Sequence, residues 1–200
     1  MIGETESRSG IAIDVPLGFV VFCDMDGTLL DTDHANYLSY KKAILEVTHG
    51  MHDVQRSAER LNRESLKKQL PSLSDAECKK IAHLKAEYFT KFLSETRVNV
   101  SLASLIRWFS GKNEIVLVTG GRKKRVLETL RHHKMRELFS QLICREDLRL
   151  GSSNKYEDAL RLMGANPESV IIFENDIVDA EKAVLAGVPR RNVLRVFSTD

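Results

Sequence analysis

The sequence predicts an α/β protein with a Rossmann-like parallel sheet and an inserted α-helical cap domain. Short, continuous apolar runs rich in β-branched residues recur along the chain, as is typical of buried parallel strands. Helical patterns lie between these runs, and one long stretch after the first run contains helical patterns only. The length of 200 residues is sufficient for one core that carries a modest insertion.

The predicted strands follow one another in a regular alternation with helices. The apolar runs are residues 19–23, 115–119, 141–144, 170–173 and 192–196. Apolar residues recur at helical spacing between them, as in Val126, Leu127 and Leu130, and again over residues 180–186. This alternation predicts a parallel sheet with right-handed crossovers.

Residues 32–97 break the alternation, because they contain no strand-like run and have helical patterns throughout. Ser74 and Glu77 have the spacing of a capping box, which predicts the start of a helix there. We therefore expect three parts: an N-terminal tail over 1–17, an α/β core over 18–31 and 98–200, and a helical cap over 32–97.

Composition excludes several classes of protein. A net charge of +2 is too mild for nucleic acid to be the main partner, and the apolar runs are far shorter than the ~20 residues of a membrane span. The polar N-terminus is unlike a secretory signal, and the three cysteines contain no CxxC pair. These features favour a cytoplasmic protein whose cysteines pack in the core, and they leave the oligomeric state open.

The most informative segment is Asp24-Met25-Asp26-Gly27-Thr28-Leu29, directly after the first predicted strand. Ligands of open α/β sheets bind outside the carboxyl ends of the strands. Asp24 and Asp26 could share a Mg²⁺ ion there, one carboxylate attacking phosphorus and the other serving as acid and base. An EF-hand is excluded, because its glycine and glutamate positions hold Leu29 and Ala35. An ordinary strand-to-helix turn remains an alternative.

Three later features fall where a phosphoryl-transfer site needs them. Thr119-Gly120-Gly121 follows the second predicted strand and could cradle an anion, although a turn without a ligand has the same composition. Lys155 could neutralise a phosphate, although single lysines are usually solvated. Acidic and amide side chains after the fourth strand could complete a metal site or simply favour a helix N-terminus: Glu174, Asn175, Asp176 and Asp179.

Other polar features favour structural interpretations. Asp31, His34 and Asn36 at the cap entrance are interpreted as a hinge and a helix cap. The basic run over residues 122–125 is interpreted as a solvated helix face, and His132-His133 as surface, since no partner has metal-ligand spacing.

Together the four loci resemble the haloacid dehalogenase superfamily over residues 19 to about 197. The resemblance implies that Asp24 is the nucleophile and Asp26 the acid and base. It implies that Thr119 and Lys155 belong to the second and third motifs, and that Glu174 to Asp179 form the fourth. The helical insert looks like the small cap of the β-phosphoglucomutase-like branch, which implies that the cap closes over the site and sets substrate choice.

One departure from the branch concerns the metal. Its fourth motif usually reads Glu-Asp, whereas this chain has Glu174-Asn175. An amide oxygen can bind Mg²⁺ but brings no charge, so we expect weaker metal affinity. Glu174, Asp176 or Asp179 could supply the missing carboxylate.

The sequence therefore predicts a Mg²⁺-dependent phosphatase that acts on a small phosphorylated metabolite through phospho-Asp24. Thr119, Gly120 and Lys155 are the predicted phosphate ligands. The predicted metal ligands are Asp24, Asp26, Asn175, Glu174 and Asp179. Asp26 disfavours dehalogenation, since displacing a halide needs no proton donor. A phosphomutase and a catalytically weak phosphate-binding or interaction protein remain alternatives.

Overall fold

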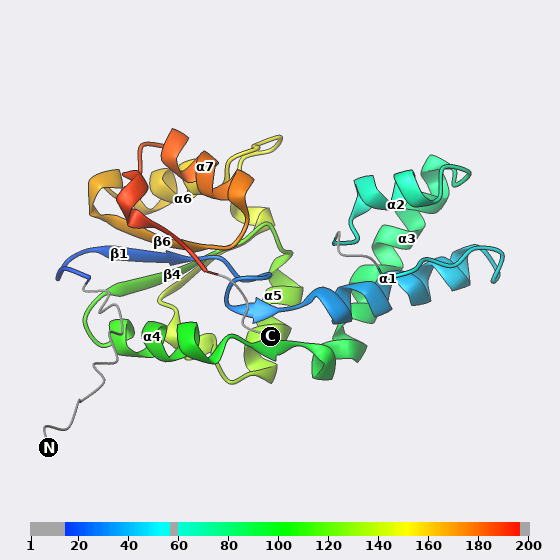
Figure 1. Cartoon of the computed structure of the whole chain (residues 1–200), viewed down its shortest axis with the longest axis horizontal. Helices are drawn as coiled ribbons and strands as arrows, with labels where there is room; N and C mark the ends of the chain where they lie inside the picture. The colour runs from blue at the N-terminus through cyan, green and yellow to red at the C-terminus, as the bar shows by residue number, and fades with distance from the viewer. Residues whose placement is uncertain (1–14, 57–59, 197–200) are drawn as a thin grey trace, which may run out of the picture.

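The computed structural model describes residues 15–56 and 60–196, which form two lobes joined by two chain segments (Figure 1). Most of the predicted tail, residues 1–14, lies outside the described residues. The core strands are β1 (Val20–Cys23), β4 (Glu114–Val118), β5 (Gln141–Ile143), β6 (Val170–Glu174) and β7 (Val193–Arg195). The core helices are α4 (Val100–Ser110), α5 (Lys123–His132), α6 (Lys155–Met163) and α7 (Ile177–Leu185). Short 3-10 helices are η2 (Arg136–Leu138), η3 (Arg145–Asp147), η4 (Pro167–Ser169) and η5 (Arg190–Asn192).

The five core strands form one parallel sheet in the order β5-β4-β1-β6-β7. β1 is central, and its Val21 pairs with Ile115 on one side and with Ile171 on the other. All five strands coincide with the predicted apolar runs to within one or two residues. The predicted α/β fold class is confirmed.

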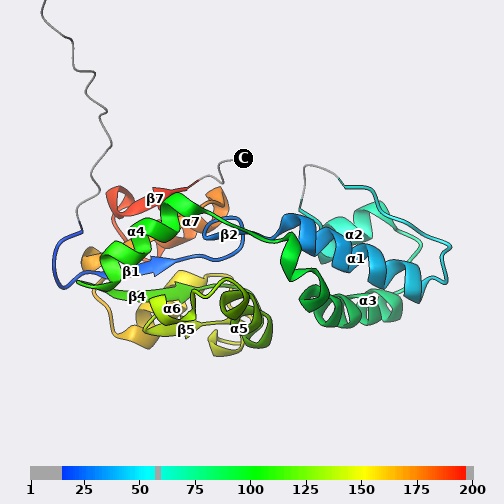
Figure 2. The same ribbon diagram turned by 90° about the horizontal axis from the view of Figure 1, so that it is seen from below.

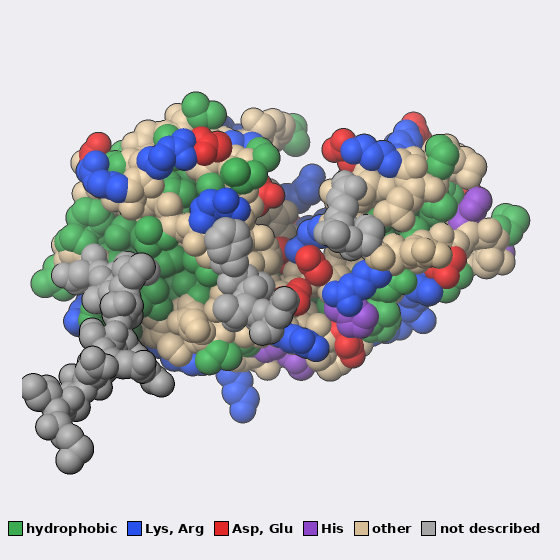
Figure 3. Space-filling model, viewed as in Figure 1, with side chains coloured by type: hydrophobic (Ala, Val, Ile, Leu, Met, Phe, Trp, Pro, Cys, Tyr) green, Lys and Arg blue, Asp and Glu red, His purple; other side chains and the backbone are tan. Residues whose placement is uncertain are grey.

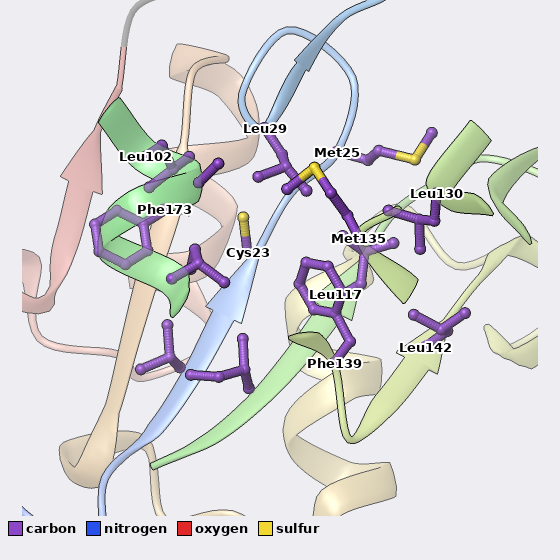
Figure 4. Close-up of a cluster of buried hydrophobic side chains, with 14 of the residues drawn as sticks. Cys23, Met25, Leu29, Leu102, Leu117, Leu130, Met135, Phe139, Leu142 and Phe173 are labelled. Atoms are coloured by element: carbon purple, nitrogen blue, oxygen red, sulfur yellow. The ribbon is translucent and has the colours of Figure 1, made fainter. Parts of the chain in front are cut away.

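Side chains of β1 alternate between two apolar layers, as period-two strands require. Val21 and Cys23 pack with α4 and α5, whereas Phe22 packs with α6 and α7. Figure 4 shows the first layer, in which Leu102 of α4 and Phe173 of β6 lie beside Cys23. Figure 1 shows α6 and α7 on one side of the sheet and α4 on the other, and Figure 2 is viewed from the side of α4. Both faces are therefore covered, which explains why the strand sequences are apolar without interruption.

The second lobe is helical and has its own apolar cluster. It contains α1 (Asp33–Val47), α2 (Arg63–Gln69), α3 (Asp75–Tyr88) and the 3-10 helix η1 (Phe89–Glu95). The predicted capping box is present, because the Glu77 amide donates to Ser74 Oγ and the Ser74 amide donates to Glu77 Oε2. Tyr40 and Ile44 of α1 pack against Ile81 of α3 in the cluster.

Two short strands at the junction of the lobes do not follow the sequence prediction. β2 (Leu30–Asp31) pairs antiparallel with β3 (Arg97–Val98), so Arg97 lies in a strand although helices alone are predicted for residues 32–97. Two residues are too few to give a period-two pattern. The ribbon ties together the two chain segments that join the lobes.

Local contacts around the junction agree in part with their structural interpretations. Asp31 accepts a hydrogen bond from the Asp33 amide where α1 begins, and Asn36 donates to the Leu61 carbonyl within the cap. His133, however, is half-buried and lies 2.6 Å from Thr96 Oγ1 through its Nε2, so its predicted surface position is wrong. The three cysteines are free, and Cys23 and Cys144 are buried, as predicted for core residues, whereas Cys78 is half-buried.

Within residues 15–56 and 60–196, no helix combines the length and the apolar character that crossing a membrane requires.

Neighbouring aromatic residues of α4 provide a test of the core. Phe109 is fully buried and stacks on Phe173, whereas Trp108 is 49% exposed. We expect Phe109→Ala to lower the free energy of unfolding by about 3–5 kcal/mol and Trp108→Ala by about 1 kcal/mol or less. Urea unfolding measures both free-energy changes, provided that the m-values of the variants equal that of the wild type. Equal losses from the two variants would contradict the assigned packing of α4.

Candidate functional site

The predicted site residues line one cavity at the carboxyl ends of the core strands. Asp24 follows β1, Thr119 follows β4, Glu174 ends β6 and Lys155 begins α6. The cavity has a volume of about 380 Å³ and opens between the two lobes, where Figure 3 shows acidic and basic side chains gathered around a hollow. Its predicted members are Asp24, Asp26, Gly27, Thr119, Gly120, Lys155, Glu174, Asn175, Asp176 and Asp179. Gly121, of the predicted Thr119-Gly120-Gly121 cradle, also lines the cavity, and the members not predicted to take part are Asp33, Arg60 and Arg125.

Lys155 is the electrostatic centre of this cavity. Its ammonium lies 2.7 Å from Asp24 Oδ1, 2.8 Å from Glu174 Oε2 and 3.0 Å from Asp179 Oδ2, and its side chain is only 11% exposed. Burial opposes the ammonium charge, but the surrounding acidic groups outweigh it and raise the pKa of Lys155 well above its usual value. Lys155 is therefore a permanent cation, and the interpretation of a solvated surface lysine is wrong.

Asp24 is buried, with 4% of its surface exposed. Its amide donates to the Phe173 carbonyl, which extends the pairing of β1 with β6 by one residue. Burial is the largest influence on its pKa; although Lys155 opposes it, Glu174 and Asp26 add to it and the pKa rises to about 7. Asp24 is thus a destabilised carboxylate that has a cation at one oxygen.

Asp26 lies in a different environment from Asp24, although only one residue separates them. Arg125 donates to both carboxylate oxygens, at 2.7 and 2.5 Å, and Thr32 donates to Oδ1 at 2.6 Å. Arg60 of the cap lies 3.3 Å from the same oxygen. Burial works against the charge of Asp26, but Arg125 and Arg60 prevail and hold its pKa well below the usual range.

Arg125 corrects the interpretation of residues 122–125 as a solvated face. Arg122, Lys123 and Lys124 are exposed, but the Arg125 side chain is only 13% exposed and binds Asp26. Helical spacing could have indicated this, because Arg125 is four residues after Gly121 and helical side chains lean toward the N-terminus. A Cβ atom on Gly121 would collide with the Arg125 guanidinium, so the glycine makes room for it.

Thr28 joins the first and fourth motifs, a role the sequence did not reveal. Its hydroxyl lies 3.1 Å from Asp24 Oδ2 and 2.9 Å from Asn175 Oδ1, and it accepts a hydrogen bond from the Asn175 amide. Gly27 turns the chain here with φ +84°, and a Cβ at Gly27 would lie 2.6 Å from Asn175 Nδ2. Glycine is thus required both for the turn and for the approach of Asn175.

The acidic residues after β6 are largely engaged by protein groups. Glu174 accepts hydrogen bonds from the Tyr156 hydroxyl and from the amides of Asn175 and Asp176. Asp176 caps α7, and Asp179 pairs with Lys182 in addition to Lys155. These contacts use both carboxylate oxygens of Glu174 and of Asp179 and one oxygen of Asp176.

Asp24 and Asn175 are left as the oxygen donors that best suit a hard divalent cation. Their side-chain oxygens converge on Thr28 from β1 and from the end of β6. Within residues 15–56 and 60–196, no three His, Cys, Asp or Glu side chains form a ready-made metal cluster. One carboxylate and one amide fit Mg²⁺, which commonly keeps several water ligands and takes one or two carboxylates from a protein.

The segment after β4 provides a small anion cradle. Thr119 Oγ1 accepts a hydrogen bond from the Gly121 amide at 3.1 Å, so that amide is already used. The Gly120 amide has no partner among the described residues. Glu146 accepts from the Lys123 amide at the start of α5. Within Thr119-Gly120-Gly121, the Thr119 hydroxyl and the Gly120 amide therefore remain for an anion.

The haloacid dehalogenase-like hydrolase family matches residues 20–193. The chain belongs to this family, and the predicted family and hydrolase class are confirmed. None of the curated proteins compared with the sequence matches it.

Solved structures share the fold at low sequence identity. The "putative phosphoglycolate phosphatase" of Lactobacillus plantarum has a TM-score of 0.70 at 15% identity, over 84% of this chain and 83% of that one. CbbY of Rhodobacter sphaeroides, in complex with phosphate, has a TM-score of 0.68 at 19% identity, over 84% and 83%. The "putative beta-phosphoglucomutase" of Thermotoga maritima has a TM-score of 0.61 at 19% identity, over 86% and 83%.

The raised pKa of Asp24 predicts how stability depends on pH. A carboxyl whose folded pKa is about 7, against an ordinary 3.8, favours folding while it is protonated, and that contribution is lost as the pH rises from about 4 to 7. Asp24→Asn cannot ionise, so its melting temperature relative to wild type is expected to rise between pH 5 and pH 8. Thermal unfolding in EDTA measures this difference.

Asp53→Asn is the matched control. Because Lys41 lowers the pKa of Asp53, this carboxyl is ionised in both the folded and the unfolded state above pH 5, so its melting-temperature difference is expected to stay constant between pH 5 and pH 8. A melting-temperature difference for Asp24→Asn that stays constant or falls as the pH rises would contradict the electrostatics assigned to Asp24.

Proposed function

We propose that this protein is a Mg²⁺-dependent phosphatase that hydrolyses a small phosphomonoester through a phosphoaspartate at Asp24. The observation that carries the proposal is the buried Asp24 carboxylate, held 2.7 Å from Lys155 in a cavity that also contains Thr119 and the free Gly120 amide. A nucleophile, a cation and anion-binding groups thus line one space at the end of the sheet. The three thiols are free, which supports a reducing, cytoplasmic location.

Asp24 would attack phosphorus and form the acyl-phosphate bond while the ester oxygen leaves. Lys155 holds the attacking carboxylate in place and neutralises charge on the phosphoryl oxygens, and Thr119 and Gly120 donate hydrogen bonds to those oxygens. Mg²⁺, held by Asp24 and Asn175, would reduce the repulsion between carboxylate and phosphate. Water then cleaves the phosphoaspartate and releases inorganic phosphate.

Asp26 is the proposed acid and base. Its contacts with Arg125 and Arg60 keep it ionised at neutral pH, so it is ready to take a proton from the attacking water. To protonate the leaving oxygen first, it must lose part of this arginine contact, because a carboxyl with a very low pKa carries no proton. Movement of the cap would change the Arg60 contact directly, since Arg60 belongs to the cap.

The same arginine contacts favour a second candidate function, a catalytically weak phosphate-binding protein. In that case Asp26 stays bound to Arg125, and ligand binds without turnover. The names of the structural neighbours include a putative phosphatase and a putative phosphoglucomutase, and one neighbour is in complex with phosphate, which supports phosphate chemistry for this protein. A phosphomutase would differ from the phosphatase in requiring a bisphosphate activator.

The first test is hydrolysis of p-nitrophenyl phosphate with Mg²⁺ and with EDTA. We expect Mg²⁺-dependent release of nitrophenol and a loss of roughly 10³-fold or more in kcat for Asp24→Asn, because the variant lacks the nucleophile. Asp53→Asn, on the cap surface, is expected to retain wild-type rates. Full activity of Asp24→Asn would refute the phosphoaspartate, and binding of phosphate without turnover would favour the second candidate function.

The metal assignment is tested at position 175. Asn175→Asp adds a negative charge beside Asp24, so we expect the Mg²⁺ concentration that gives half-maximal effect to fall about tenfold. The Mg²⁺-dependent rise in melting temperature measures this even if turnover is lost. Asp176→Asn serves as the neighbouring control and is expected to leave the Mg²⁺ dependence nearly unchanged. Unaltered Mg²⁺ dependence in Asn175→Asp would exclude residue 175 as a ligand.

A further inference from the structure

We propose that the substrate carries a second anionic group, a carboxylate or a phosphate, which binds in a basic cavity beside the phosphoryl site. This inference rests on the proposed function and specifies its substrate class. The basic cavity has a volume of about 230 Å³ and lies between the cap and the core. Its cationic lining residues are Arg60, Lys85, Arg122, Arg125 and Arg145.

The basic cavity is continuous with the phosphoryl site. Gly120, Gly121, Arg60 and Arg125 line both spaces. Their charges nevertheless differ, because six carboxylate residues line the phosphoryl site whereas no carboxylate residue is among the described residues that line the basic cavity. A ligand with two anionic ends could therefore place one at Lys155 and the other among the arginines.

Several cations of the basic cavity lack an acidic partner. Among the described residues, no carboxylate forms an ion pair with Lys85, Arg122 or Arg145. Lys85 lies instead near the rings of Tyr40 and Phe89, 5.1 and 5.4 Å from their centroids. Lys85 is half-buried, and Arg122 and Arg145 are exposed. Cations that line one space repel one another, and a bound anion would relieve that repulsion.

The pKa of Lys85 is affected by its burial and by the neighbouring arginines. Burial is the main cause of its low pKa, and repulsion from Arg125 and Arg60 lowers it further, to about 7. Only Asp26 acts in the opposite direction. Repulsion from the two arginines thus adds to the effect of burial on Lys85.

Asp26 is the internal competitor for the proposed anion. Arg125 and Arg60 contact Asp26 and also line the basic cavity. A second anionic group would share these guanidinium groups and weaken their hold on Asp26. A substrate without a second anion would leave Asp26 tied to Arg125.

Matched ligand pairs provide the test. The first pair is 2-phosphoglycolate and its neutral amide, and the second is 1,3-propanediol bisphosphate and the corresponding monophosphate. In each pair we measure kcat/KM with Mg²⁺, and calorimetric binding to the Asp24→Asn protein, which reads affinity without turnover. We expect the doubly anionic member of at least one pair to be preferred by about tenfold or more in both measurements. The pair that responds identifies the second group as carboxylate or phosphate.

Variants connect the preference to the basic cavity. Lys85→Met is expected to lower the preference at least about fivefold, whereas Lys80→Met, on the exposed face of the same helix, leaves it unchanged. Because Lys85 is partly buried, the exposed Arg145→Gln provides a second variant, with Arg131→Gln as its control.

Each outcome separates this inference from the proposed function. No hydrolysis of any ligand, together with a Lys85-dependent binding preference, would refute the phosphatase but support the basic cavity. Hydrolysis without preference between the members of either pair would refute the basic cavity and leave the phosphatase standing. A preference that survives both Lys85→Met and Arg145→Gln would also overturn the inference, as would the absence of measurable binding.

Discussion

The buried ammonium of Lys155 is the interaction on which the organisation of this site depends. Parallel strands bring their carboxyl ends to one edge of the sheet, and here that edge carries Asp24 after β1 and Glu174 at the end of β6, with Asp179 in α7. Carboxylates gathered in one partly enclosed space repel one another unless a cation lies between them. Lys155 supplies that cation from α6 and contacts all three. It does not abolish the strain, since the pKa of Asp24 remains near 7. A further cation, or a reaction that removes the negative charge of Asp24, would therefore lower the free energy of the site.

The two aspartates of the first motif, Asp24 and Asp26, have opposite electrostatic environments although they are close in sequence. Asp24 points toward Lys155 and the oxygen donors of β6, whereas Asp26 points toward Arg125 and the cap. The pKa of the first is raised and that of the second is lowered. Opposite shifts within one motif are the physical basis for assigning different roles to two identical side chains. They also show that the acid role of Asp26 depends on what happens to its arginine partners.

The division into two lobes allows the contacts between Asp26 and its arginine partners to change. Arg125 belongs to α5 of the core, but Arg60 belongs to the cap, and Thr32 lies at the ribbon of β2 and β3. Contacts to Asp26 therefore come from both sides of the opening between the lobes. Any displacement of the cap alters the environment of Asp26 more than that of Asp24, whose partners all belong to the core. The contacts of Asp24 thus lie within the core, whereas those of Asp26 depend in part on the position of the cap.

The sequence by itself determined the strands, the sheet type and most of the site. Strands that are buried on both faces of a sheet are apolar without interruption, so they can be recognised from local composition. Parallel strands share one direction, so the polar residues that follow them lie at the same edge of the sheet. Asp24, Thr119 and Glu174 were identified for this reason, whereas Lys155 was identified in a loop that enters a helix.

The tertiary structure alone decided which of these groups face one another and which partners neutralise them. Arg125 and Arg60 lie 99 and 34 residues from Asp26 along the chain. The spacing from Gly121 is the one local sign that Arg125 is turned inward, and it does not identify Asp26 as the partner. The same holds for Thr28, whose hydroxyl contacts Asn175 across 147 residues. Pairings between distant residues depend on the packing of α5 and of the cap against the sheet, whereas local pattern reports only burial and backbone conformation.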